Sequence, residues 1–585
     1  DNVAVGNNVL DANTTGTQNV AMGYNALGAN TTASYNTAIG HKALEVSTTS
    51  SENTAVGAEA LGAMSTGSAN TAVGHRALED CTTGSQNVAV GQRALYEQTT
   101  GEKNTALGWN AGGAITAASF NTYVGQRAGD ANSSSNNTAV GSESLSSNCG
   151  PDNTAVGANA LLTCTGSNNV GVGASALYAN TSASGNTAVG WHSQMRTTTG
   201  SGNISVGQNT LENITTANFN TAIGNAALRD STTSDNTAVG YNALYLNSTG
   251  HTCTAVGSKA LDANTGGEYN TALGAAALGA ITTGDRCTAI GTYALTANTG
   301  SYNTGVGMYA LTANTTAQYN DAFGYSALGG SNTGEYNVSI GSYSMDANTS
   351  GAENVAVGNN ALGVNTTGSY NVAVGRGAMD ANTTGERNTA LGMNALGANT
   401  TASWNVAVGQ NTLGATTTGS KNVAVGTFAL DTNTTGTNNV AIGHDALTAL
   451  TTNSYCTAVG DYALANNTSQ YMAAFGAQAL GDNTTGTQST GLGFRALRLN
   501  TTGNRNTAVG YDAMYTNTTG HYNTAVGNYA LRLNTADYNC AVGDYALAAN
   551  TTGQQNTAIG GGGPLSANTT GNYNTAVGAA ALDAN

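Results

Sequence analysis

The residues of this chain that could carry out chemistry are few and lie far apart. Only 8% of the 585 residues are charged, and there are six histidines and seven cysteines. General acid–base catalysis needs titratable groups that converge on one reacting atom. The histidines instead stand at variable positions of a repeating pattern, and we interpret them as surface residues of turns: His41, His75, His192, His251, His444 and His521. We therefore expect no catalytic residue and no enzymatic activity.

The sequence indicates neither a metal site nor a phosphate site. Asp11, Asp262 and Asp380 occur singly in their repeats, without the dense aspartate spacing of calcium-binding repeats. The glycine run at 560–563 lacks the lysine and the following helix of a phosphate-binding loop. We expect no metal ion and no cofactor, and we interpret the acidic residues as a solvated rim.

Two cysteines are candidates for a disulfide. Cys149 and Cys164 stand at similar places in two successive repeats, which makes a bond between them geometrically feasible. Cys253, Cys287 and Cys456 are two or more repeats apart, too far to pair with one another. The odd number of cysteines leaves the redox compartment open.

Asn-Thr-Thr triplets are the strongest local signal. They are acceptor sites for N-glycosylation, and the same residue types are typical of turns. The sequence leaves both interpretations open. The candidate glycosylation sites are Asn13, Asn30, Asn314, Asn365, Asn382, Asn399, Asn433, Asn483, Asn500, Asn517, Asn550 and Asn568.

All of these residues belong to one repeat that fills the chain. Its motif Asn-Thr-Ala-Val-Gly, with variants, begins 35 times between Asn2 and Asn574. Most repeats are as long as the step from Asn19 to Asn36, seven are shorter by a single residue, and one is longer by a single residue. We expect a single uninterrupted repeat region over residues 1–585, which stops within a repeat. Since solenoids need caps, we expect the chain to be a segment of a longer fibre.

The columns of the repeat predict an all-β fold. Numbered from the Asn, position 4 is always apolar, position 3 is nearly always Ala, Ser or Gly, and position 5 is always Gly. The β-branched cluster at positions 2 to 4 predicts a strand of four or five residues, and the Ala-Leu pair at positions 8 and 9 predicts a second short strand. Each repeat then forms one coil of a parallel β-solenoid of about 35 coils, each of about 16–18 residues.

Stacking of these coils is obligatory, because one coil buries too little apolar surface to offset the entropy of ordering it. With strands about 4.8 Å apart, the coils would form a rod on the order of 170 Å long. We expect the asparagine columns to form ladders of side-chain amides. Changes of repeat length should fall in turns, because their backbone meets water, as at the glycine run 560–563.

The sequence allows two orientations of the first strand. Gly112 and Gly129 replace the position-9 Leu in successive repeats, and Tyr123 occupies position 3 of the second. If Tyr123 fills the space they leave, position 3 points inward and the position-4 column forms an outward apolar stripe that partner chains must cover. We favour the opposite orientation, in which position 4 packs inside against the position-9 Leu and the small position-3 face meets partners.

The motif variants Asn-Thr-Ala-Ile-Gly at 36–40 and Asn-Val-Ser-Ile-Gly at 337–341 give a family resemblance. The repeats resemble the head repeats of YadA-like trimeric autotransporter adhesins, and equally those of phage and large-virus tail fibres that end in an endosialidase-type chaperone domain. The resemblance implies a left-handed β-roll, three chains side by side as a trimer, and attachment to surfaces. This chain differs from those families in that its coil is longer and that no coiled-coil stalk, membrane anchor or chaperone domain is recognisable in the sequence.

Composition excludes two classes of function. With 16 Lys and Arg against 32 Asp and Glu, the chain offers no basic patch for nucleic acid. Every apolar run is interrupted long before the roughly 20 residues that span a membrane.

The leading hypothesis is a structural and adhesive extracellular fibre on a cell or virion surface, a homo-oligomer for which we favour a trimer, with surface glycans as candidate partners. The alternatives are a virion tail fibre for host attachment and an ice-binding solenoid that uses its threonine columns, although Val and Asp321 interrupt the threonines at position 2. A polysaccharide-degrading β-helix would need a carboxylate cluster, which we do not find. Aromatic residues at positions 6, 7 and 17 could stack on sugars or bases, but we favour shielding of the ladder: Tyr24, Trp191, Tyr241, Tyr309 and Trp404.

Overall fold

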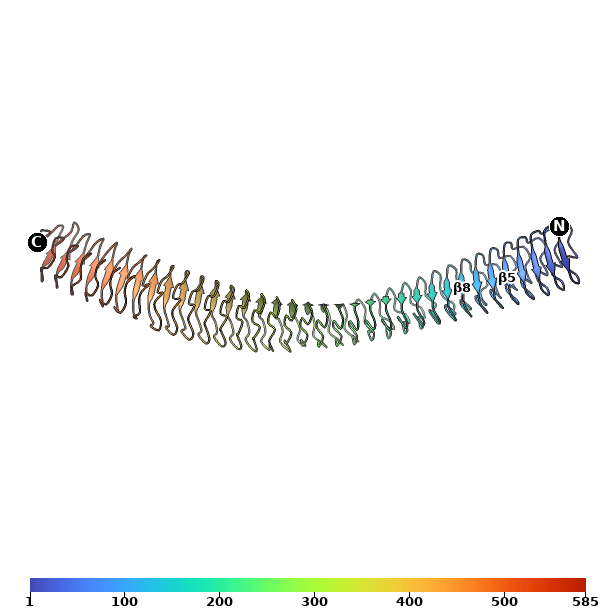
Figure 1. The fold of residues 1–585 in the computed structure, drawn as a ribbon, viewed down its shortest axis with the longest axis horizontal. Coiled ribbons are helices and arrows are strands. Elements are labelled where there is room, and N and C mark those ends of the chain that lie inside the picture. The colour runs from blue at the N-terminus through green and yellow to red at the C-terminus, as the bar shows by residue number, and fades with distance from the viewer. Residues whose placement is uncertain (585) are drawn as a thin grey trace. The chain divides into compact units, whose positions relative to one another are not determined.

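The chain forms a parallel β-solenoid in which each coil contributes one strand. The computed structural model describes residues 1–584, and every regular element among them is a strand of three residues. The coils gather into two compact units, residues 1–289 and the residues from 290 onward, which are built alike. Figure 1 shows the strands of successive coils and labels two of the first unit, β5 (Thr71–Val73) and β8 (Thr122–Val124).

The strands occupy positions 2 to 4 of their repeats throughout. The first unit contains β1 (Val3–Val5), β2 (Val20–Met22), β3 (Thr37–Ile39), β4 (Thr54–Val56), β5 (Thr71–Val73), β6 (Val88–Val90), β7 (Thr105–Leu107), β8 (Thr122–Val124), β9 (Thr138–Val140), β10 (Thr154–Val156), β11 (Val170–Val172), β12 (Thr187–Val189), β13 (Ile204–Val206), β14 (Thr221–Ile223), β15 (Thr237–Val239), β16 (Thr254–Val256) and β17 (Thr271–Leu273). The division between the units falls within β18 (Thr288–Ile290). The second unit contains β19 (Thr304–Val306), β20 (Asp321–Phe323), β21 (Val338–Ile340), β22 (Val355–Val357), β23 (Val372–Val374), β24 (Thr389–Leu391), β25 (Val406–Val408), β26 (Val423–Val425), β27 (Val440–Ile442), β28 (Thr457–Val459), β29 (Ala473–Phe475), β30 (Thr490–Leu492), β31 (Thr507–Val509), β32 (Thr524–Val526), β33 (Cys540–Val542), β34 (Thr557–Ile559) and β35 (Thr575–Val577).

Neighbouring strands within each unit pair in parallel with like positions opposite each other. In a repeat of the common length Ala21 lies opposite Ala38. Ala139 pairs with Ala155 across one of the shorter repeats, and Ala558 pairs with Ala576 across the longest, and both pairs keep the same register. The extra and missing residues are therefore taken up outside the strands, as expected.

The expected second strand is wrong, because the backbone around the Ala-Leu pair is turned rather than extended. Asn25 at position 7 and Leu27 at position 9 have left-handed φ angles of 57° and 48°, and the same two positions are left-handed in most coils. The segment is still bonded from coil to coil, since the Leu27 N–H donates to the Ala43 carbonyl at 3.0 Å. Left-handed turns in successive coils can thus form backbone hydrogen bonds in register with one another although their backbone is not extended.

Close packing of backbones explains why position 5 is always Gly. Gly375 has φ of 139°, and a Cβ added there would lie 2.4 Å from the carbonyl oxygen of Gly392 in the next coil. Both the backbone conformation and the space therefore require a residue without a side chain.

The orientation that we favoured for the first strand is wrong: position 3 points inward and position 4 outward. Ala21 and Ala38 are fully buried, whereas Met22 and Ile39 are 46% and 37% exposed. Successive strand side chains alternate between faces. Because the position-1 Asn is buried, position 3 must be buried as well, and the interior has room only for a small residue opposite the position-9 Leu.

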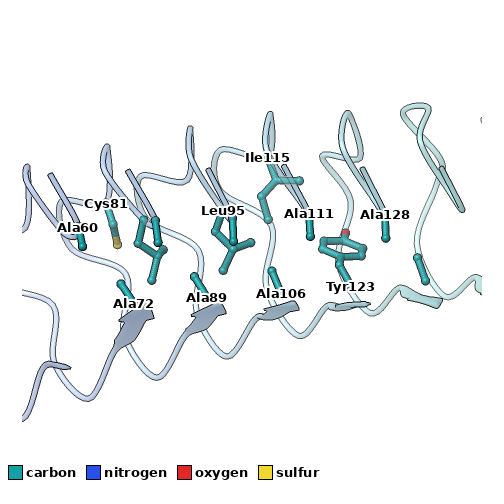
Figure 2. Packing of buried hydrophobic residues seen from close by; sticks show 14 of the residues in the cluster. Ala60, Ala72, Cys81, Ala89, Leu95, Ala106, Ala111, Ile115, Tyr123 and Ala128 are labelled. Carbon is teal, nitrogen blue, oxygen red and sulfur yellow. The ribbon is translucent and has the colours of Figure 1, made fainter. Parts of the chain in front are cut away.

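Tyr123 is the exception that demonstrates this packing. Its side chain is fully buried and fills the space left by the two glycines at position 9. A Cβ at Gly129 would lie 2.3 Å from the ring, and one at Gly112 would lie 2.9 Å from it. Figure 2 shows the Tyr123 ring inside the coils, in the layer that Leu95 occupies further along.

We expect Tyr123→Ala to destabilise the surrounding coils by about 3–5 kcal/mol, the cost of emptying an aromatic core position. Tyr123→Phe should keep their stability, because the buried hydroxyl has no hydrogen-bond partner among the described residues. Amide hydrogen exchange of residues 104–136 measures the local opening free energy. Unchanged protection in Tyr123→Ala would contradict the packing described here.

Candidate functional site

A ladder of asparagines at position 1 joins most coils to the next. The side-chain oxygen of Asn36 accepts a hydrogen bond from the N–H of Asn53 at 2.9 Å, and that of Asn19 accepts one from Asn36 at 3.0 Å. The Asn36 amide nitrogen donates across its own coil to the Ser50 carbonyl at 2.9 Å. The buried Asn36 amide thus links the strand, the wide turn and the next coil, and its oxygen and nitrogen both have partners.

The sequon asparagines at position 12 form a second interior ladder. The Asn365 amide nitrogen donates to the side-chain oxygen of Asn348 at 2.9 Å and to the Gly368 carbonyl at 3.0 Å. Of the twelve candidate glycosylation sites, Asn13 is half-buried, Asn568 is 3% exposed, and the other ten are fully buried: Asn30, Asn314, Asn365, Asn382, Asn399, Asn433, Asn483, Asn500, Asn517 and Asn550. N-glycosylation modifies this same nitrogen, so a glycan and the ladder exclude each other.

The cysteine pair takes the place of asparagines in this ladder. Cys149 and Cys164 are buried free thiols in neighbouring coils, and the Cys164 thiol donates to the Gly166 carbonyl at 3.3 Å. Burial raises the pKa of the Cys149 thiol far above its ordinary value. The two candidate disulfide partners therefore lie in neighbouring coils of the interior as unbonded thiols.

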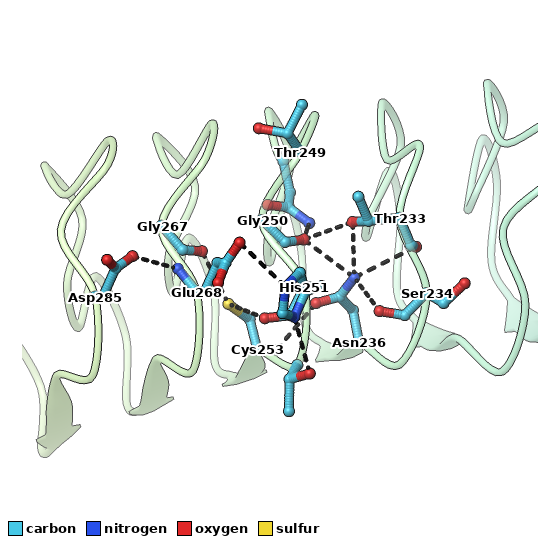
Figure 3. A network of polar contacts seen from close by, with 12 residues as sticks. Thr233, Ser234, Asn236, Thr249, Gly250, His251, Cys253, Gly267, Glu268 and Asp285 are labelled. Atoms are coloured by element: carbon cyan, nitrogen blue, oxygen red, sulfur yellow. Dashed lines mark hydrogen bonds and ion pairs between the residues drawn. The ribbon is translucent and has the colours of Figure 1, made fainter.

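Other buried thiols are unsuited to nucleophilic chemistry. Burial raises the pKa of Cys253 and of Cys456 to about 11, and that of Cys81 to about 12. The thiolate is the reactive form, and at neutral pH these groups stay protonated. In Figure 3 the Cys253 thiol donates to backbone carbonyls, including that of Gly267 at 3.3 Å, and so replaces the position-1 asparagine in its ladder.

The histidines lie on the outside of the coils and contact one or two carboxylates or the residues of neighbouring turns. The His251 ring nitrogen lies 3.0 Å from a Glu268 carboxylate oxygen in the next coil, as Figure 3 shows. His444 lies 3.3 Å from Asp445 and 3.6 Å from Asp461. No group of three or more His, Cys, Asp or Glu within residues 1–584 is placed to hold a metal ion.

A groove that sequence reasoning missed runs between the side chains of position 7 and those of positions 10 and 11; we name it the position-10 groove. It opens where position 10 is small. In the first unit it holds a cavity of about 360 Å³ beside Glu45, Gly62 and Glu79. In the second unit the cavities measure about 320, 430 and 640 Å³. The alternation of small and large residues at position 10 was the available signal.

Asp11 is exposed, as expected of a solvated rim, but four other acidic residues at position 10 are more buried than we expected. Burial raises the pKa of the carboxyls of Asp262, Asp346, Asp380 and Asp431. Their ionised forms are thus less favourable in the folded than in the unfolded chain, so their contribution to stability grows as the pH falls through the raised pKa.

Aromatic rings stack on one another along the outer surface. At position 17 the rings of Tyr302, Tyr319 and Tyr336 follow each other at centroid distances of 4.8 and 4.9 Å, nearly parallel. Tyr522 and Tyr538 repeat this geometry at 4.9 Å. Both faces of the inner ring, Tyr319, are therefore covered by neighbouring rings.

The outward face of the strands carries an apolar stripe, which consists of the position-4 column and the Val and Ile residues of position 2. Leu107, Leu273, Leu391 and Leu492 are 46–48% exposed at position 4. Exposed apolar surface that repeats in every coil is typical of an interface rather than of a surface left to water.

No protein-family model matches this chain, and no curated protein matches it. The part of the chain that the structure describes contains no helix long and apolar enough to cross a membrane.

We expect Asn371→Asp to break the position-1 ladder. The Asn371 amide nitrogen donates to the Gly385 carbonyl at 2.8 Å, and its oxygen accepts from the Asn388 N–H at 3.0 Å. A carboxylate loses the donor and faces that carbonyl, which should cost about 2 kcal/mol at neutral pH.

The loss of stability in Asn371→Asp should become smaller as the pH falls through the raised pKa of the introduced carboxyl, since the protonated carboxyl can again donate a hydrogen bond. Hydrogen exchange of residues 354–405 at several pH values measures this. Asn360→Asp at exposed position 7 is the control and should stay close to wild type. Equal protection in both variants would contradict the ladder.

We also expect the peptides that contain the buried sequons to carry no glycan when a digest of the native protein is analysed by mass spectrometry. Occupancy at Asn365 or Asn500 in folded material would show that the interior ladder is absent there.

Proposed function

We propose that this chain is a non-catalytic structural fibre of a cell or virion surface, in which the outward strand faces of several copies pack together and the variable turns face the surroundings. The observation that carries the proposal is the apolar stripe, which repeats in each coil of both units. Side chains of the inner face fill the interior of each coil, so the stripe is not part of the core of a single chain.

A second copy of the same chain is the partner that fits the stripe. Its coils rise by the same step, about 4.8 Å per strand, so contacts made in one coil recur in the next. Charge does not oppose the association, since Asp321 is the only acidic residue among the described strands. We favour three copies, as the resemblance to trimeric adhesin repeats implies, and adhesion then falls to the turns.

A run of threonines supports ice binding as a second candidate. Thr221, Thr237, Thr254 and Thr271 lie in register on the outward face of four successive strands. Ala473 and Cys540 interrupt the corresponding column in the second unit. A thermal-hysteresis assay tests this candidate directly.

The oligomeric state tests the leading proposal. We expect the wild-type chain to sediment as an oligomer in analytical ultracentrifugation. The double variant Val408→Lys, Val425→Lys places charges in the stripe and should shift it to monomer with an unchanged far-UV circular dichroism spectrum. The matched control Gln410→Lys, Thr427→Lys adds the same charges in the adjoining turns and should remain oligomeric.

A wild-type chain that stays monomeric at all concentrations would refute packing of the strand faces. Compact globular particles in electron micrographs would refute the fibre itself.

A further inference from the structure

The position-10 groove of the second unit contains a trough between residues 432 and 498, with a volume of about 640 Å³. Thr448, Ala465 and Gly481 form its floor at position 10 of three successive coils. Asp445, Tyr462 and Gln478 form one wall at position 7, and the other wall carries Thr432, Ala449, Asn466 and Asp482 at position 11.

Side-chain size at position 10 defines the extent of the trough. Arg498 occupies position 10 of the next coil and ends it, with its guanidinium paired to Asp482 and its Nε donating to Gln478 at 3.4 Å. Tyr515 and Arg532 hold the same position in the two coils beyond. Three small residues in succession are therefore what opens the hollow.

The charges that line the trough already have partners. Asp482 pairs with Arg498 and accepts from the Asn466 amide at 3.2 Å. The Asp445 carboxylate lies 3.3 Å from His444, and it raises the pKa of Tyr462 by its charge and by a hydrogen bond with that side chain. The walls thus present oriented donors and acceptors rather than an excess of one charge.

Tyr462 adds an apolar platform, since its side chain is 42% exposed on the wall. A half-exposed aromatic ring beside amide, hydroxyl and carboxylate groups matches a ligand with one apolar face and a hydroxylated edge. The pyranose ring of a sugar has this character. Anionic ligands would meet two carboxylates, and a basic peptide would have to displace the ion pairs already formed.

We propose that this trough binds a neutral oligosaccharide, with one sugar ring on Tyr462 and its hydroxyls bonded to Asp445, Asn466 and Gln478. The proposal rests on the adhesive part of the proposed function and supplies it with a ligand class. It does not depend on self-association, because every lining residue belongs to one chain.

The test uses the full chain and a panel of neutral hexasaccharides: cellohexaose, maltohexaose, mannohexaose and chitohexaose. An oligogalacturonate and an oligolysine serve as charged comparisons. We expect isothermal titration calorimetry to detect binding of at least one neutral member. Ala465→Arg fills the floor with a side chain that other coils accept at this position, as at Arg229 and Arg498, and should weaken binding at least tenfold.

Tyr462→Ala should weaken binding similarly. The matched controls lie outside the trough: Ser146→Arg at position 10 and Tyr529→Ala at position 7 should bind like wild type. The inference is overturned if no neutral member binds at millimolar concentration, if Ala465→Arg leaves binding unchanged, or if oligolysine or the oligogalacturonate is the ligand that this variant loses. Measuring the stripe variant Val408→Lys, Val425→Lys alongside separates failure of self-association from failure of sugar binding.

Discussion

The hydrogen bond from each position-1 asparagine side chain to the backbone of the next coil constrains the rest of the structure. It requires the amide to lie inside, as for Asn36 and Asn53. The alternation of a strand then places position 3 inside and positions 2 and 4 outside. The alanine interior, the apolar outer stripe and the room that Tyr123 fills all follow from this one choice of face. Burial of this amide is favourable because its hydrogen bonds recur in most coils.

Repetition made most of the fold readable from the sequence. A nearly constant repeat length with one apolar β-branched cluster predicted one coil per repeat, and the invariant Gly marked the turn. Two details were wrong for identifiable reasons. The apolar residues at position 4 led us to place that position inside. The buried asparagine ladder instead fixes which face of the strand points inward. The combination of Tyr123 with Gly112 and Gly129 indicated this correct orientation. The left-handed backbone at Leu27 carries no sequence signal, because leucine rarely adopts it.

The candidate sites were harder to predict because they belong to no single repeat. Asn365 reads as a surface glycosylation site in isolation, and only the stacked coils show that its nitrogen is engaged twice. The trough is formed by positions 7, 10 and 11 of several coils. Thr448, Ala465 and Gly481 lie a full repeat apart in the sequence and become one floor only when the register is known.

Because of the two ladders, interior positions and outer turn positions of the coil tolerate substitution differently. Interior positions can change only to residues that keep the bonds or the volume, as Cys253 does by donating to Gly267 in place of an asparagine. Side chains at the outer turn positions need not keep these bonds or this volume, since the stacking of a coil does not depend on them. Position 10 accordingly ranges from Gly481 to Arg498 in adjacent coils without a change of register between β29 and β30. A solenoid of this kind can thus acquire a binding surface by substitution at the turns alone, while its strand faces stay uniform enough to associate with copies of themselves.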